Sequence, residues 1–187
     1  MSTVREGEAL KKSLTFYQTI GFLFTGITGS LLHFLYEWTN ESILIAPFSA
    51  VNESVWEHMK LLFYPMFIFA VAEKPFLISR YRSFHCAKLS GTVVGLLIIP
   101  VLYYTYTGAL GVSADWFNIA IFFIAAAAAY FTETLIMKSV GSSCRFPSLV
   151  FIILCLIALS FVLLTFVQPE IPLFRDPVTG IYGIKQQ

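Results

Sequence analysis

Five stretches of this chain are long and apolar enough to cross a bilayer, and they constrain its fold more than any other feature. They cover residues 14–36, 54–72, 87–106, 116–137 and 147–168. A helix needs about 20 mostly apolar residues to span the hydrocarbon core, and backbone groups in lipid must be hydrogen-bonded internally. Only 12% of the chain is charged, against about a quarter in soluble domains. The sequence therefore predicts an all-α integral membrane bundle of five transmembrane helices.

The basic residues predict how this bundle is oriented. Nine of the twelve fall on one side of the predicted spans, and basic residues favour the cytoplasmic side. These nine are Arg5, Lys11, Lys12, Lys74, Arg80, Arg82, Lys88, Lys138 and Arg145. We therefore expect residues 1–168 to form a transmembrane domain with a cytoplasmic N-terminus, and residues 169–187 to form a tail outside. The acidic residues are concentrated on the outer side, where their negative potential attracts cations.

Two polar faces meet at the outer ends of the first two predicted spans. With helical spacing, residues on one face of the first are Gly26, Ser30, His33 and Glu37, and residues on one face of the second are Glu53, Glu57, Lys60 and Tyr64. Because the two spans are consecutive and antiparallel, we expect these ends to lie at the same depth. Imidazole and carboxylate ligands suit zinc, iron or manganese.

The predicted site is thus a centre for a divalent metal. Its expected ligands are His33, Glu37, Glu53 and Glu57, and its expected catalytic residues are Glu57, Glu53 and His58. His58 lies about 100° around the helix from Glu57, so we expect it beside the ion rather than on it.

A purely structural interpretation explains much of the same segment. Ser54 and Glu57 have the spacing of a capping box, and Asn52 is an equally good cap. Acidic side chains also favour the positive end of a helix, and Lys60 is spaced to pair with Glu57. This interpretation accounts less well for His33 and Glu37, which lie in an apolar span and would be costly if they faced lipid.

Glu133 lies apart from this site, near the inner end of the fourth predicted span. We expect it to pair with Lys138 or with an arginine of a loop. If a water path joined it to the outer cluster, it would instead act in a proton or ion relay.

The three cysteines, Cys86, Cys144 and Cys155, show no spacing typical of a disulfide or a metal site. Two of them fall on the predicted cytoplasmic side, where thiols stay reduced. We therefore expect three free thiols.

The tail contains the turn signature Asp176–Gly180 between apolar residues. We expect it to fold back over the outer mouth of the bundle, with Asp176 or Arg175 completing the site. The alternative is a tail that lies on the membrane interface through its aromatic residues.

A family resemblance covers nearly the whole chain. The segments that carry it are HFLYEW, NESVWEHMKLLFYP and PLFRDPVTGIYG. Together they resemble an uncharacterised family of small bacterial multi-spanning membrane proteins, known as a domain of unknown function. The resemblance implies a bacterial inner-membrane protein and brings no assigned activity.

Three functional classes are consistent with these features. The first is a metal-dependent membrane enzyme that hydrolyses a lipid or peptide bond. The second is a cation- or proton-coupled transporter or channel, and the third is a non-catalytic membrane partner subunit. The expected partners are membrane lipids and a second copy of the chain in a homodimer. No nucleic-acid signature is present in the sequence.

Overall fold

The computed structural model describes residues 2–184 of the chain, and their side chains from residue 13 onward. The described elements are α1 (Ser2–Trp38), α2 (Val55–Leu77), α3 (Phe84–Leu110), α4 (Asp115–Lys138), α5 (Pro147–Phe166) and the short 3-10 turn η1 (Pro172–Phe174). This part of the chain contains no strand, only an isolated antiparallel bridge between Arg175 and Tyr182. The side chains of Arg5, Lys11 and Lys12 lie outside the described residues.

All five α-helices are long and apolar enough to cross a membrane, which confirms the predicted helices and fits a multi-pass membrane protein. The helix ends lie close to the predicted ends except at the start of α1, which begins at Ser2 rather than near residue 14, and at the end of α2. This helix continues past the predicted end at residue 72, through Pro75, to Leu77. The extra turn brings Glu73 into the bundle, where it is buried.

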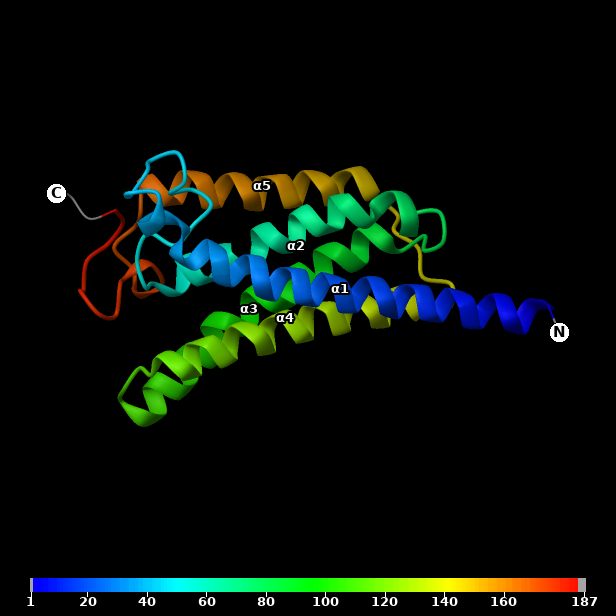
Figure 1. The fold of residues 1–187 in the computed structure, drawn as a ribbon, viewed down its shortest axis with the longest axis horizontal. Coiled ribbons are helices and arrows are strands. Elements are labelled where there is room, and N and C mark those ends of the chain that lie inside the picture. The colour runs from blue at the N-terminus through cyan, green and yellow to red at the C-terminus, as the bar shows by residue number, and fades with distance from the viewer. Residues whose placement is uncertain (1, 185–187) are drawn as a thin grey trace.

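The helices run side by side, and their connections gather at two ends (Figure 1). At the end shown on the left lie the α1–α2 loop (residues 39–54), the α3–α4 turn and the tail that follows α5; we call this the site end. The other connections and the start of α1 lie at the opposite end. Toward the site end, the α3–α4 hairpin leans away from α1.

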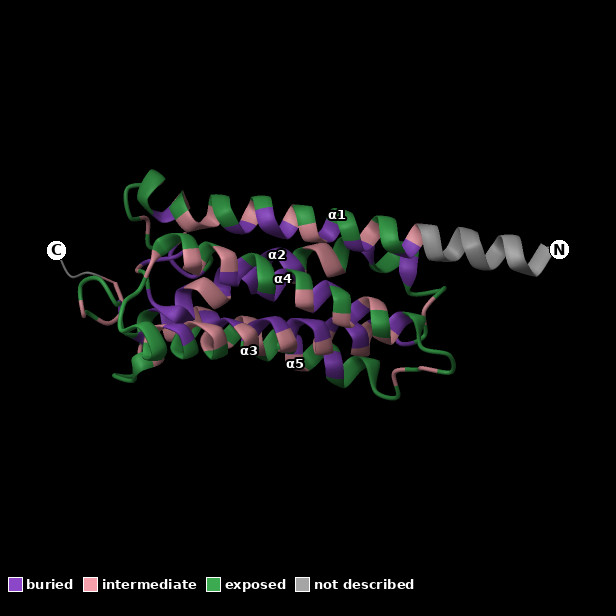
Figure 2. Cartoon of the chain, turned by 90° about the horizontal axis from the view of Figure 1, so that it is seen from below, coloured by how far each residue is buried: buried purple, intermediate pink, exposed green. Residues whose placement is uncertain are grey.

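Small residues allow α3 and α4 to approach closely, as the run of alanines in α4 predicts. Ala125, Ala126 and Ala129 are fully buried. A Cβ atom added at Gly91 of α3 would lie 2.7 Å from the carbonyl oxygen of Ala129. The buried residues face the inside of the bundle, while the outward faces of the helices are exposed (Figure 2). In an apolar bundle, such outward faces are those that lipid would cover.

The expectation of three free thiols is wrong for two of the cysteines. Cys86 and Cys144 form a disulfide, with an S–S distance of 2.04 Å and a sequence separation of 58. The start of α3, which carries Cys86, and the α4–α5 loop, which carries Cys144, meet at the opposite end, where the backbone N–H of Cys144 donates a hydrogen bond to the carbonyl of Arg82. Sequence spacing could not show this contact because it depends on how α3, α4 and α5 pack. Cys155 is a free, exposed thiol, as expected.

We predict that Gly91→Ala lowers the free energy of unfolding by about 1–3 kcal/mol, the usual cost of overpacking. The added methyl group would press on the backbone of α4, which has no room to move. Gly108→Ala is the matched control in the same helix, because nothing lies within 4 Å of a Cβ atom there. Unfolding in detergent measures both. Equal stability of the two variants would contradict close α3–α4 packing.

Candidate metal centre

Three side chains from three segments converge at the site end. His33 comes from α1, Glu53 from the α1–α2 loop and His58 from the second turn of α2. His33 Nε2 lies 3.5 Å from Glu53 Oε1, and His58 Nε2 lies 3.6 Å from Glu53 Oε2. One ligand atom from each residue lies within 4.8 Å of the other two. We call these three residues the His–Glu cluster.

The hydrogen bond made by Nδ1 of His58 shows which ring nitrogen of this residue carries the proton. Nδ1 lies 2.9 Å from the carbonyl oxygen of Ser54. A carbonyl oxygen only accepts hydrogen bonds, so Nδ1 carries the proton. In a neutral ring, Nε2 then points a lone pair at the Glu53 carboxylate. Two electron-rich atoms at this distance repel each other unless a proton or a metal cation lies between them.

The cluster also fits the geometry of a metal site. Ligands bound to zinc at about 2.0–2.1 Å in a tetrahedral arrangement lie about 3.4 Å apart, close to the two nitrogen–oxygen distances of the cluster. Two histidines and one carboxylate form a ligand set found in catalytic zinc and non-haem iron sites, which leaves coordination positions open. A hydrogen bond from the outer nitrogen of a ligating histidine to a carbonyl, as in His58, is typical of such sites.

A large cavity borders one side of the cluster. It has a volume of about 810 Å³ and lies between α1, α2, α4 and the tail, within the usual range for small-molecule sites. Most of its wall is apolar and includes Phe34, Leu61, Val112, Ile119, Phe122 and Phe123. His33, Glu53 and His58 supply polar groups at one wall. The cavity can therefore accept an apolar molecule with one polar end.

A second, smaller cavity borders the other side of the cluster. It has a volume of about 220 Å³, and its acidic residues are Glu37, Glu41, Glu53 and Asp176. His33 and Glu53 line both cavities. We call this smaller cavity the acidic vestibule. Its negative charge favours cations, so the cluster separates a polar space from an apolar one.

Helix α2 begins at Val55, two residues after Glu53, the first residue of the proposed polar face. Ser54 is its N-cap, and the backbone N–H of Glu57 donates to the Ser54 hydroxyl at 3.4 Å. Asn52 accepts a hydrogen bond from the backbone N–H of Ser54 at 2.9 Å. Glu53 therefore precedes the helix, and it does not share a helical face with Glu57.

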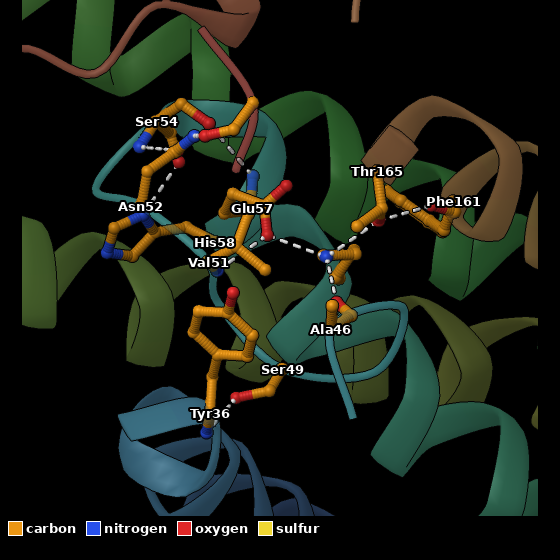
Figure 3. A network of polar contacts seen from close by, with 12 residues as sticks. Tyr36, Ala46, Ser49, Val51, Asn52, Ser54, Glu57, His58, Phe161 and Thr165 are labelled. Atoms are coloured by element: carbon orange, nitrogen blue, oxygen red, sulfur yellow. Dashed lines mark hydrogen bonds and ion pairs between the residues drawn. The ribbon is translucent and has the colours of Figure 1, made fainter. Parts of the chain in front are cut away.

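Glu57 instead forms a buried ion pair with Lys60, as the structural interpretation of the sequence predicts. Lys60 Nζ lies 2.6 Å from Glu57 Oε2, and both side chains are completely buried. Lys60 also donates to the Ala46 carbonyl and to the Thr165 hydroxyl, each at 2.9 Å (Figure 3). The backbone N–H of Val51 donates to Glu57 at 3.0 Å. This network ties the α1–α2 loop and the end of α5 to α2.

Of the four predicted metal ligands, the structure brings His33 and Glu53 together. Glu37 is exposed and lines the vestibule, one turn beyond His33. Glu57 and Glu37 are not in the group of ligand atoms that lie within 4.8 Å of one another. His58, rather than Glu57, lies beside Glu53, because His58 and Glu57 face different sides of α2.

The tail packs onto the loop that carries Glu53. The side-chain amide of Asn52 donates to the carbonyl of Gly183 at 3.0 Å, and Gln168 donates to Glu57 at 3.2 Å. The carboxylate of Asp176 accepts hydrogen bonds from the backbone N–H groups of Val178, at 2.7 Å, and Glu53. Asp176 therefore holds the backbone at Glu53, while Arg175 is exposed.

At the opposite end, Glu133 has a different partner from those expected. It pairs with Lys88 of α3, which also pairs with Glu73 of α2. The prediction of Lys138 or a loop arginine is therefore wrong. The charge pattern of the sequence places Lys88 among the basic residues of the cytoplasmic side and does not predict that Lys88 and Glu73 are buried. Their positions one turn inside their helices could have suggested burial.

Comparison with known proteins identifies a family to which no activity is assigned. The profile described as a family of unknown function (DUF6512) matches residues 5–184. No curated protein and no solved structure matches the chain.

We predict that Lys60→Met lowers the free energy of unfolding by about 3–5 kcal/mol, because it leaves the Glu57 carboxylate buried and unpaired. Adding Glu57→Gln should recover much of this loss by removing the charge. Lys74→Met is the control in the same helix, at an exposed position, and it should change stability by no more than about 0.5 kcal/mol. Unfolding in detergent measures all three. A double variant as unstable as Lys60→Met would argue against the pairing.

A pH prediction follows from Asp176. Burial alone would raise the pKa of this carboxyl group, but hydrogen bonds from Val178, Thr179 and Glu53 outweigh burial and hold its pKa below the usual value. The docked tail therefore favours the carboxylate. Its contribution to stability is complete above the unfolded pKa of about 3.9 and is lost as the pH falls through the lower folded value.

Trp56 reports on this docking, because its ring lies 4.7 Å from the ring of Phe174 in the tail. In a variant with Trp38→Phe and Trp116→Phe, Trp56 fluorescence should stay constant at neutral pH and change below about pH 4. Adding Asp176→Ala should change the Trp56 fluorescence at neutral pH and abolish its change below about pH 4. The same fluorescence change with Asp176→Ala would contradict the role of Asp176.

Proposed function

The chain belongs to this family of unknown function, and we propose from its geometry that its His–Glu cluster binds a divalent metal and hydrolyses a membrane-embedded amphiphile. One observation carries the proposal. His33 Nε2 and His58 Nε2 both face the Glu53 carboxylate at 3.5–3.6 Å, while Nδ1 of His58 is committed to the Ser54 carbonyl. A cation between these atoms removes their repulsion, and the ligand set leaves coordination positions open to the large cavity.

Zinc, iron or manganese would act here as a Lewis acid toward a carbonyl or phosphoryl oxygen. His33, Glu53 and His58 would hold the metal. Ser54 fixes the ring of His58 through its carbonyl, and Asp176 fixes the backbone at Glu53. Glu57 would then act as a positioning residue, because it anchors the loop through Val51 rather than facing the cavity. Glu37 in the vestibule would attract the cation.

The large cavity supports an amphiphile as the substrate class. Phe34, Ile119 and Phe123 line this cavity and are also among the exposed large apolar side chains of α1 and α4. The cavity therefore opens sideways, between two helices that are apolar enough to lie in a membrane. An acyl chain could enter there from the lipid while its polar head reached the cluster. The vestibule would supply water from the other side.

We further propose that the protein lies in a bacterial inner membrane with the site end outside. The basic residues support this orientation, and the resemblance to small bacterial membrane proteins supports the inner membrane. The Cys86–Cys144 disulfide lies at the proposed cytoplasmic end, although disulfides favour oxidising compartments. The basic residues act on orientation while the helices insert, before any disulfide can form.

The purified protein should retain about one zinc, iron or manganese ion per chain, measured by elemental analysis in detergent. His33→Ala and His58→Ala should each weaken metal binding by more than about tenfold, since the loss of even an outer partner has that effect. The same variants should abolish release of headgroup or fatty acid from vesicles of bacterial phospholipid.

Glu37→Gln is the control for this experiment, because Glu37 lies on the same helix one turn beyond His33 and outside the cluster. It should keep the bound metal. Metal content that survived the loss of both histidines would rule out the centre. Bound metal without any lipid hydrolysis would retain the centre and reject the reaction.

A further inference from the structure

A second cluster of ionisable side chains is sealed inside the bundle at the opposite end. Lys88 of α3 forms ion pairs with Glu73 of α2 and with Glu133 of α4. Glu73, Lys88 and Glu133 are only 2%, 4% and 1% exposed. We call these three residues the Lys–Glu cluster. It plays no part in the proposed hydrolysis.

The charges in this cluster do not balance if both carboxyl groups are ionised. One ammonium group faces two carboxylates, which leaves one negative charge. The aromatic rings of Phe84 and Tyr130 lie 5.7 and 5.5 Å from Lys88 Nζ and carry no positive charge. The Tyr130 hydroxyl hydrogen-bonds with Thr25 of α1 at 2.9 Å.

The described side chains of α1, from residue 13 onward, do not supply the missing positive charge either. Their nearest contribution is the uncharged amide of Gln18, which hydrogen-bonds to Glu133. Among the described residues, the ionisable groups acting on Glu73 are Lys88 and Glu133, with Tyr130 beside them. A net charge held inside an apolar bundle costs several kcal/mol. The cluster therefore requires one more positive charge.

The hydrogen-bonding pattern shows where this charge can reside. Glu133 is held by both Lys88 and Gln18. Glu73 is paired with Lys88 through Oε1, but its Oε2 is buried and has no hydrogen-bond partner in the described part of the chain. A buried oxygen without a partner is uncommon in folded proteins. It marks the atom of the cluster that is open to a ligand.

We propose that the Lys–Glu cluster is a binding site for one exchangeable proton, held on Glu73. The bound proton gives the cluster one ammonium, one carboxylate and one carboxylic acid, with no net charge. On release, the O–H bond of Glu73 breaks, the proton passes to water, and the electron pair stays on the carboxylate. Two carboxylates then share one ammonium group, and their repulsion weakens the packing of α2 against α4.

The position of the cluster suits exchange from one side of the membrane. Glu73 lies four residues before the end of α2, and Lys88 lies four residues after the start of α3. Water at the opposite end is therefore about one helical turn away. Proton occupancy would favour the closely packed bundle, and proton release would favour a looser one.

The test is thermal unfolding in detergent from about pH 5.5 to pH 9. The wild-type midpoint should fall as the pH rises, because the folded cluster gives up its proton and retains a buried negative charge. Glu73→Gln removes one carboxyl group and should give a midpoint that no longer depends on this proton. Glu133→Gln should act in the same way, since it also leaves one cation with one carboxylate. The exposed Glu41→Gln is the control and should follow the wild type.

Infrared spectroscopy provides a second measurement. The wild type at neutral pH should show a carboxylic-acid carbonyl band that Glu73→Gln lacks and Glu41→Gln keeps. The proposal is overturned if the wild type lacks this band and Glu73→Gln is destabilised equally at every pH. It is also overturned if sodium chloride, but not choline chloride, restores the wild-type midpoint at high pH, because the bound cation would then be sodium.

Discussion

The buried ion pair between Glu57 and Lys60 is the interaction on which the site end depends. Neither group can be solvated inside the bundle, so each must find its partners within the protein. Those partners come from the α1–α2 loop, from α5 and from the tail. The hydrogen bonds that stabilise the charges of Glu57 and Lys60 therefore hold three segments around the start of α2. Glu53 owes its position beside His33 and His58 to this arrangement.

The molecule uses ionisable residues in two different ways at its two ends. The His–Glu cluster is partly exposed, with side chains of His33 and Glu53 that are 26% and 48% accessible, and it borders two cavities. The Lys–Glu cluster is closed, and Gly91 makes room for Glu133 where any larger residue would press on α4. An open cluster can bind and release large molecules, whereas a closed one can bind and release only a small ion. This difference supports separate roles for the two ends.

Much of the fold could be predicted from apolar stretches and helix spacing, because the cost of burying backbone in lipid leaves few alternatives. The same reasoning identified His33, Glu53 and His58 as candidates. It could not place Glu53 before the helix, because Ser54 and Asn52 were equally good caps. It could not exclude Glu57 from the cluster, because Glu57 has the spacing of either a ligand or a partner of Lys60. Metal binding itself stays a prediction.

Contacts between distant segments were beyond the reach of the sequence. The Cys86–Cys144 disulfide and the pairing of Lys88 with two glutamates each depend on how three helices pack. Charge counting placed Lys88 with the solvent-facing basic residues, although its side chain turns into the bundle. A basic residue near a helix end has the same pattern whether it faces solvent or a buried carboxylate.

The packing of the tail also has a consequence for biosynthesis. Asn52 is bonded to Gly183, and the backbone at Glu53 is bonded to Asp176. These residues of the tail are made after all five helices. The His–Glu cluster can therefore mature only once the tail has been made, so a nascent or truncated chain that lacks the tail would reach the membrane with its helices inserted but its centre unassembled.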